Sequence, residues 1–233
     1  MSIEYEAIPQ LSGVNPDLRA YVEAEIFPRY EKFFSHGIKH IHHVIGNALM
    51  LAEFYHKDFD IAYTAAACHD LGLKIDRAHH ETASGKIIAE NKKLLDFFSP
   101  AEVQVIREAA EDHRGSRKTP PRSFYGRIIS DSDRDFDLET LAWRMIATST
   151  KNYTNLTTCE QHFDRCYEYM SGRITQNGHF NLWTNNPILI ERREKFEKEF
   201  LDRDYCSKVY IKAYKRMASD GTLEKVLNYY EDF

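Results

Sequence analysis

The stretch IAYTAAACHDLG, residues 61–72, decides the fold of this chain. Its apolar residues recur at three- and four-residue intervals, which is the periodicity of an α-helix. The face with this spacing carries mostly small side chains, which allow a second helix to approach closely: Ile61, Ala65, Cys68 and Gly72. The helix is expected to end at the pair His69-Asp70, so two groups that can bind a metal follow a largely apolar helix directly.

The same periodicity extends through most of the chain. Residues 40–55 carry an apolar stripe at helical spacing, and His40 lies at its start. Residues 99–102, SPAE, combine a capping serine, a proline at the first helical position and a glutamate three residues after the cap. No alternating strand pattern persists. We therefore predict an all-α protein, with additional helices from about residue 138 onward.

The composition indicates a globular protein in aqueous surroundings. Of the 233 residues, 42% are hydrophobic and 29% are charged, and no apolar run is long enough for a membrane span. We predict one all-helical domain over residues 1–233 and, because the N-terminus lacks a signal-peptide pattern, a cytoplasmic location. The four cysteines contain no CxxC pair and are expected to be thiols. A net charge of -5 argues against a nucleic-acid polymer as partner.

Four residues form a candidate ligand set for a divalent metal. His40 precedes the pair His69-Asp70, and Asp133 follows it. Imidazole and carboxylate together suit an intermediate ion such as Mn²⁺, Fe²⁺, Co²⁺ or Zn²⁺, although Ni²⁺ and Mg²⁺ also stay open. Such an ion turns water into a nucleophile, so hydrolysis is the first reaction class to consider. Helical spacing alone does not choose between Asp133 and Asp131 as the last ligand.

In this order, His40, His69-Asp70 and Asp133 resemble the HD superfamily of metal-dependent phosphohydrolases. The resemblance covers an HD core at about residues 36–137, followed by C-terminal helices at about 138–233. It implies an HD-domain helical bundle in which these four residues hold the metal. It favours Asp133 over Asp131, because the acid of the family precedes a basic residue. The chain departs from many relatives at two positions, His43 and Asp135.

Two further histidines can extend this set. Some HD proteins hold a second metal with histidines between the His-Asp pair and the last aspartate, and His80 and His113 occupy comparable places. Each can instead donate a proton to a phosphate or a leaving group. A histidine near a helix C-terminus, such as His113, is also favoured by the helix dipole whatever its function.

Four more residues are candidates for the reaction itself. Lys74 and Asp76 closely follow the His-Asp pair, and Asp76 is a candidate general base, although a solvated loop explains both residues equally well. Arg114 and Arg134 adjoin proposed site residues, and a guanidinium matches the oxygens of a phosphate. The remaining histidines near the set are expected at the surface or beside the ligands: His36, His42, His43 and His79.

The sequence therefore predicts a cytoplasmic metal-dependent hydrolase, a phosphomonoesterase or phosphodiesterase, with one or two metal ions per chain. Its substrate is expected to be a small phosphate ester, with a nucleotide as one candidate. Two alternatives stay open. One is a di-iron HD-type oxygenase, and the other is a non-catalytic module that binds a nucleotide or phosphate. The sequence leaves the oligomeric state open.

Overall fold

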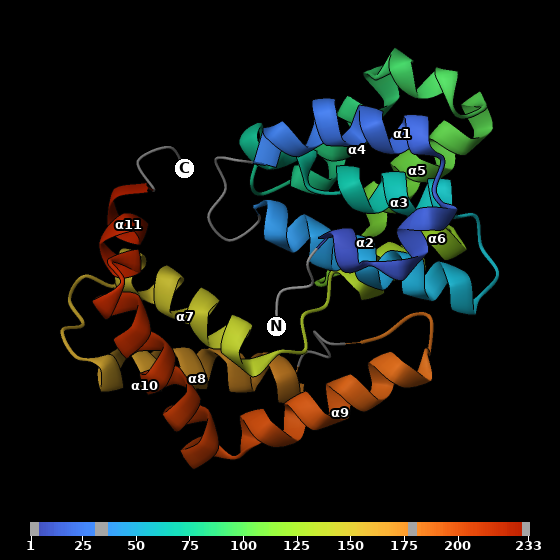
Figure 1. Cartoon of the computed structure of the whole chain (residues 1–233). Helices are drawn as coiled ribbons and strands as arrows, with labels where there is room; N and C mark the ends of the chain where they lie inside the picture. The colour runs from blue at the N-terminus through green and yellow to red at the C-terminus, as the bar shows by residue number, and fades with distance from the viewer. Residues whose placement is uncertain (1–4, 31–36, 177–180, 230–233) are drawn as a thin grey trace. The chain divides into compact units, whose positions relative to one another are not determined.

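The computed structural model describes residues 5–30, 37–176 and 181–229 (Figure 1). These residues form eleven α-helices and several short 3₁₀ or π turns, and the described part of the chain contains no strand. The predicted all-α fold class is therefore confirmed. Among the described helices, none combines the length and the apolar character that a membrane span requires.

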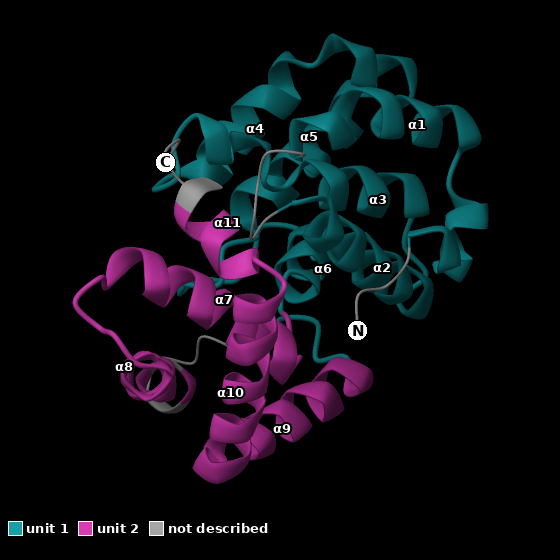
Figure 2. Ribbon diagram, turned by 60° about the vertical axis from the view of Figure 1, so that its left-hand side comes forward, with its two compact units in different colours: residues 1–134, 181–186 teal, residues 135–180, 187–233 magenta. Residues whose placement is uncertain are grey.

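The chain divides into two compact units, which Figure 2 shows in different colours. The first comprises Met1–Arg134 and Asn181–Asn186, and the second comprises Asp135–Phe180 and Pro187–Phe233. The first unit thus contains most of the predicted core and adds the N-terminal helices and one short segment from much later in the sequence. That the whole chain acts as one domain stays a prediction.

The first unit is built around one buried helix. Its α-helices are α1 (Pro16–Tyr21), α2 (Ile38–Phe54), α3 (Phe59–Cys68), α4 (His80–Glu90), α5 (Pro100–Asp112) and α6 (Phe124–Ser132). Helix α3 packs against α2, α5 and α6, and every residue from Ile61 to Cys68 is buried. The small side chains of this stretch permit these close approaches. The apolar periodicity around the His-Asp pair therefore marks the centre of the unit.

Side-chain caps mark where three helices of this unit begin: α3, α5 and α6. The Asp58 carboxylate accepts a hydrogen bond from the backbone N–H of Ile61 at the start of α3. At the start of α5, Ser99 and Glu102 form the reciprocal capping box that the sequence predicts. Ser123 caps α6 through the backbone N–H of Gly126. Because the caps set the helix boundaries, they also set where the residues at the opposite helix ends lie.

The second unit contains five helices around aromatic side chains. They are α7 (Leu138–Asn152), α8 (Cys159–Gln176), α9 (Pro187–Leu201), α10 (Arg203–Ser219) and α11 (Thr222–Tyr229). Helix α10 packs against each of the other four. Its Tyr210 is buried, as are Phe196 and Phe200 of α9, and charged residues of α9 form i,i+4 ion pairs. The four cysteines of the chain are free thiols, as predicted.

Candidate metal centre

The structure brings the four predicted ligands together at three helix ends. His40 lies in the first turn of α2, His69 and Asp70 follow α3, and Asp133 follows α6. Nε2 of His40 lies 3.2 Å from Oδ1 of Asp133 and 3.7 Å from Oδ2 of Asp70. Nε2 of His69 lies 3.4 Å from the same Asp70 oxygen. Because α2, α3 and α6 pack on one another, residues far apart in sequence meet in one cluster.

His80 and His113 join this cluster from the other side of Asp70. Their Nε2 atoms lie 3.2 Å apart, and they lie 3.4 Å and 3.5 Å from Oδ1 of Asp70. His80 opens α4, and α4 reaches Asp70 because Gly72 has no side chain. A Cβ at Gly72 would collide with the backbone of His80 and Ser84. The glycine after the His-Asp pair therefore admits the helix that carries His80.

The cluster has two sides, one around each carboxylate oxygen of Asp70. The first half-site consists of His40, His69 and Asp133 around Oδ2 of Asp70. The second half-site consists of His80 and His113 around Oδ1 of Asp70.

Backbone carbonyls set the orientation of three of these imidazoles. Nδ1 of His69 lies 2.7 Å from the carbonyl oxygen of Ala66, and Nδ1 of His113 lies 2.6 Å from that of Ala110. Nδ1 of His80 approaches the Arg77 carbonyl in the same way. A carbonyl only accepts hydrogen bonds, so Nδ1 carries the proton and Nε2 of a neutral ring keeps its lone pair. Nε2 of each ring therefore faces a carboxylate of the cluster.

Tyr30 completes the end of α3 behind the His-Asp pair. The last carbonyls of a helix have no partner within the helix and must find one elsewhere. The Tyr30 hydroxyl, which is fully buried, donates a hydrogen bond of 2.9 Å to the carbonyl of Ala67. The backbone N–H of Asp70 also bonds to this hydroxyl and lowers the pKa of Tyr30, while burial and nearby charges raise that pKa overall. Tyr30 thus holds the turn from which the Asp70 carboxylate projects.

The charges of the cluster shift the pKa values of its members. Burial alone lowers the pKa of His69, but the charges of Asp70 and Asp133 outweigh it and raise the pKa to about 9. Burial raises the pKa of Asp133, but the hydrogen bond and charge of His40, with the charges of His69 and His113, lower it overall. Burial lowers the pKa of His80. The charges of the cluster therefore favour the charged forms of His69 and Asp133, whereas burial favours the neutral form of His80.

The donor set fits a metal ion. Nε2 of His69 is buried and has no hydrogen-bond partner among the described residues. Two groups of three potential ligand atoms each lie within 4.8 Å: one of His40, His69 and Asp133, the other of His69, Asp70 and His113. Imidazole nitrogens and carboxylate oxygens that converge in a buried place are the ligands of intermediate divalent ions. These residues can hold a metal, and the histidines disfavour Mg²⁺.

Asp131 serves a different purpose from Asp133. It is fully buried, and its carboxylate accepts hydrogen bonds from the backbone N–H groups of Trp183 and Thr184 and from the Thr184 hydroxyl, at 2.6–3.0 Å. The Tyr55 hydroxyl donates to the Thr184 carbonyl at 2.7 Å. These bonds attach residues 181–186 to the first unit. The geometry therefore favours Asp133 as the site residue. Asp131 instead holds residues 181–186 in place, a role that sequence spacing does not reveal.

Lys74 and Asp76 lie in the exposed loop between the His-Asp pair and α4. The Asp76 carboxylate accepts hydrogen bonds from the backbone N–H groups of Ala78 and His79 and contacts the His79 ring at 3.1 Å. These hydrogen bonds from His79 and Ala78 lower the pKa of Asp76, which makes it a weaker base. Its contacts favour a role in shaping the loop. That either residue takes part in the reaction stays a prediction.

The two predicted phosphate ligands are both engaged within the protein. Nη1 of Arg114 donates to the Ala78 carbonyl at 2.5 Å and to the Glu81 carboxylate at 3.3 Å. Arg134 is only 7% exposed, and its guanidinium packs where a side chain at Gly115 would stand. Burial lowers the pKa of Arg134, while the charges of Asp133 and Asp131 oppose that shift. A contact of either arginine with substrate stays a prediction.

The other histidines that the sequence places near the ligand set have partners of their own, except for His36, which is outside the described residues. His42 stacks on Tyr5, and His79 pairs with Asp76. The Asn47 amide nitrogen lies 3.0 Å from Nε2 of His43 and donates to the carbonyl of Ser132 at 3.2 Å. Asn47 thereby connects α2 to the residue before Asp133. A polar residue among the apolar residues of 40–55 is the sequence feature that indicates such a buried contact.

Comparison with known proteins agrees with this geometry. Residues 37–136 match the family model described as HD domain. No curated protein and no solved structure matches the chain. The match supports the resemblance of this span to the HD superfamily of metal-dependent hydrolases, and the span includes the His and Asp residues that can hold a metal.

Proposed function

We propose that this protein is a metal-dependent phosphohydrolase that cleaves a small phosphate ester, with nucleotides as candidate substrates. The observation that carries the proposal is the position of Asp70. One of its carboxylate oxygens faces His40 and His69, and the other faces His80 and His113. A carboxylate between two groups of imidazoles is suited to bridge two divalent ions.

The two half-sites divide the ligands between two ions. The first ion would be held by His40, His69, Asp133 and one oxygen of Asp70, and the second by His80, His113 and the other oxygen. Nitrogen and oxygen donors in this proportion favour Mn²⁺, Fe²⁺, Co²⁺, Ni²⁺ or Zn²⁺. Bound ions of this kind activate water and stabilise the charge that develops on phosphoryl oxygens.

The protein's own residues prepare this place for the reaction. The carbonyls of Ala66 and Ala110 fix the rings of His69 and His113, so their nitrogens need no reorientation to bind an ion. Arg134 brings a buried positive charge beside Asp133 and Asp131. Two members of the cluster are partly open to solvent, Asp133 with 21% of its side chain exposed and His80 with 15%. Substrate therefore approaches most easily past these two side chains.

A second candidate, the di-iron oxygenase, is favoured by the presence of all six potential ligands: His40, His69, Asp70, His80, His113 and Asp133. Both candidates use the same ligands, so they differ in the metal and in the co-substrate. Iron-dependent consumption of O₂ in the presence of a substrate would support the oxygenase. Tight binding of a nucleotide or phosphate without any product would instead support a non-catalytic module.

The proposal is tested by phosphatase assays on metal-free protein to which single divalent ions are returned. A chromogenic phosphomonoester, a chromogenic phosphodiester and a panel of nucleotides serve as substrates. We expect metal-dependent release of product that is lost in Asp70→Ala and kept in Glu90→Ala, a control at an exposed carboxylate of α4. Equal turnover by Asp70→Ala and the unaltered protein would refute the assignment.

A further inference from the structure

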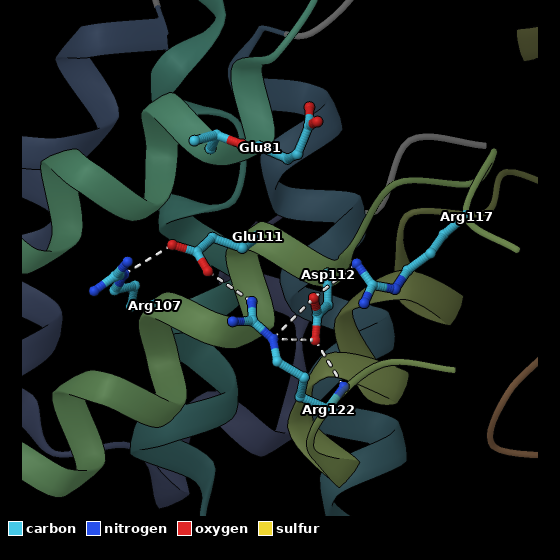
Figure 3. A pocket seen from close by; sticks show the side chains of 7 residues that line it. Glu81, Arg107, Glu111, Asp112, Arg117 and Arg122 are labelled. Atoms are coloured by element: carbon cyan, nitrogen blue, oxygen red, sulfur yellow. Dashed lines mark hydrogen bonds and ion pairs between the residues drawn. The ribbon is translucent and has the colours of Figure 1, made fainter. Parts of the chain in front are cut away.

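Each histidine of the second half-site has an acidic neighbour in the sequence. Glu81 follows His80 at the start of α4, and Asp112 precedes His113 at the end of α5. Both acids line a surface pocket together with arginines, as Figure 3 shows. The pocket residues are Glu81, Thr82, Arg107, Glu111, Asp112, Arg117 and Arg122. The backbone that presents the two imidazoles to Asp70 therefore also carries a set of ion pairs.

Asp112 is the most buried charge in this pocket, with 1% of its surface exposed. Oδ2 accepts hydrogen bonds from the backbone N–H of Arg122 at 2.7 Å and from its Nε at 3.0 Å (Figure 3). Nη1 of Arg117 lies 2.9 Å from Oδ1. One carboxylate therefore binds two arginines of the loop that follows α5.

Arg122 carries this connection on to α6. It directly precedes Ser123, which caps α6, and its Nη2 also donates to the Glu111 carboxylate at 2.6 Å. The first turn of α6 approaches closely, since a Cβ at Gly126 would lie 3.4 Å from Cβ of Asp112. The pair Asp112–Arg122 thus joins the end of the helix before His113 to the start of the helix that ends at Asp133.

A second acid–arginine pair joins α4 to the same loop. Nη1 of Arg114 lies 3.3 Å from both oxygens of Glu81 and also donates to the carbonyl of Ala78. Arg114 directly follows His113, and Glu81 directly follows His80. The two helix ends that supply the second half-site are therefore tied to each other outside the half-site itself.

We infer that Asp112, held by Arg122 and Arg117, is a positioning residue for His113 and thereby for the second of the two ions. The inference rests on the proposed two-ion site. The Asp112 carboxylate is buried, while Arg122 and Arg117 are partly exposed. Loss of an arginine partner leaves a buried negative charge less compensated, and loss of the carboxylate charge releases both arginines, so the end of α5 and the following loop must rearrange. His113 directly follows Asp112 and moves with that backbone, whereas His40 and His69 lie at the ends of α2 and α3, and Asp133 follows α6 at the end opposite to Arg122.

The test is a calorimetric titration of the metal-free protein with Mn²⁺, in which elemental analysis gives the number of ions. The variants are Asp112→Asn and, in case that protein does not fold, Arg122→Gln at a partly exposed position. Arg107→Gln is the matched control, because Arg107 lines the same pocket but pairs with Glu111. Arg122→Lys tests whether a positive charge restores part of the effect.

We expect two ions in the unaltered protein and in Arg107→Gln. In Asp112→Asn and Arg122→Gln, the affinity for the second ion should fall about 10- to 100-fold, as for residues that orient a metal ligand, while the first ion is retained. Arg122→Lys should bind the second ion with an intermediate affinity. Undiminished binding of both ions by both variants, or equal weakening of both ions, would overturn this inference and leave the two-ion site standing. A single ion in the unaltered protein would overturn the two-ion site and the inference together.

Discussion

The two half-sites each have one partly exposed side chain, Asp133 at 21% in the first and His80 at 15% in the second, but different interactions hold their residues in place. The first half-site is assembled where α2, α3 and α6 pack together through apolar faces. The second is assembled at the ends of α4 and α5, where acid–arginine pairs reinforce the packing. Apolar packing is spread over many contacts, while an ion pair depends on two groups. The first half-site should therefore tolerate single substitutions around it better than the second.

Substitution of the shared carboxylate should abolish the difference between the half-sites. In Asp70→Ala both ions lose a ligand, so we expect both to be lost and turnover to fall by more than about 100-fold, beyond the usual effect of residues behind a ligand. Elemental analysis and a phosphatase assay measure the two effects. Circular dichroism should show that the helices persist. A fully active variant would contradict the shared role of Asp70.

Removal of one histidine should affect the ion of one half-site and leave the ion of the other. His113→Ala should lower the metal content from two ions to one, because Oδ1 of Asp70 keeps only His80 beside it. His40→Ala removes a residue of the first half-site and serves as the comparison. Native mass spectrometry of each variant with bound metal counts the ions directly. Two ions in His113→Ala would show that this residue is not a ligand.

Loss of the Tyr30 hydroxyl should weaken both half-sites to the same extent. Tyr30→Phe leaves the buried carbonyl of Ala67 without its hydrogen bond, which costs about 1–3 kcal/mol of folding stability. It also loosens the turn that presents Asp70, so we expect an affinity loss of about 10-fold for each ion. Thermal unfolding and a metal titration measure these changes. Tyr21→Phe, which removes a hydroxyl bonded to Asn91 instead, should leave the metal affinities unchanged.

The smallest effect on metal binding is expected at Asp131. Asp131→Asn replaces a carboxylate that accepts hydrogen bonds from Trp183 and Thr184, so it should lower the stability of the first unit by about 1–3 kcal/mol. Metal content should stay at two ions. Chemical denaturation and elemental analysis of the same preparation test both statements. Loss of an ion without loss of stability would return Asp131 to the list of ligands.

The sequence predicts the first half-site more completely than the second. His40, His69-Asp70 and Asp133 stand in a recognisable order, and helical periodicity places each near a helix end. The Asp112–Arg122 pair could not be foreseen, because it depends on the path of the loop after α5. The same holds for the bonds from Asp131 to residues 183 and 184, which join segments far apart in the chain.

Adjacency in sequence does not determine where an arginine side chain points. Arg114 adjoins His113, and its guanidinium pairs with Glu81. Arg134 adjoins Asp133 and is buried beneath Gly115. Helix periodicity fixes which face a residue occupies, but in a loop only the tertiary contacts decide where a long side chain points. The hydrogen bond of Tyr30 could not be predicted either, since its partner at Ala67 lies in a helix far along the chain.

The central claim is that one carboxylate, Asp70, serves two ions. The most direct test is elemental mass spectrometry of protein purified without added metal and then reconstituted, with Asp70→Ala and His113→Ala treated in parallel. The account predicts about two ions per chain in the unaltered protein, about one in His113→Ala and almost none in Asp70→Ala. It would be contradicted if Asp70→Ala retained as much metal as His113→Ala.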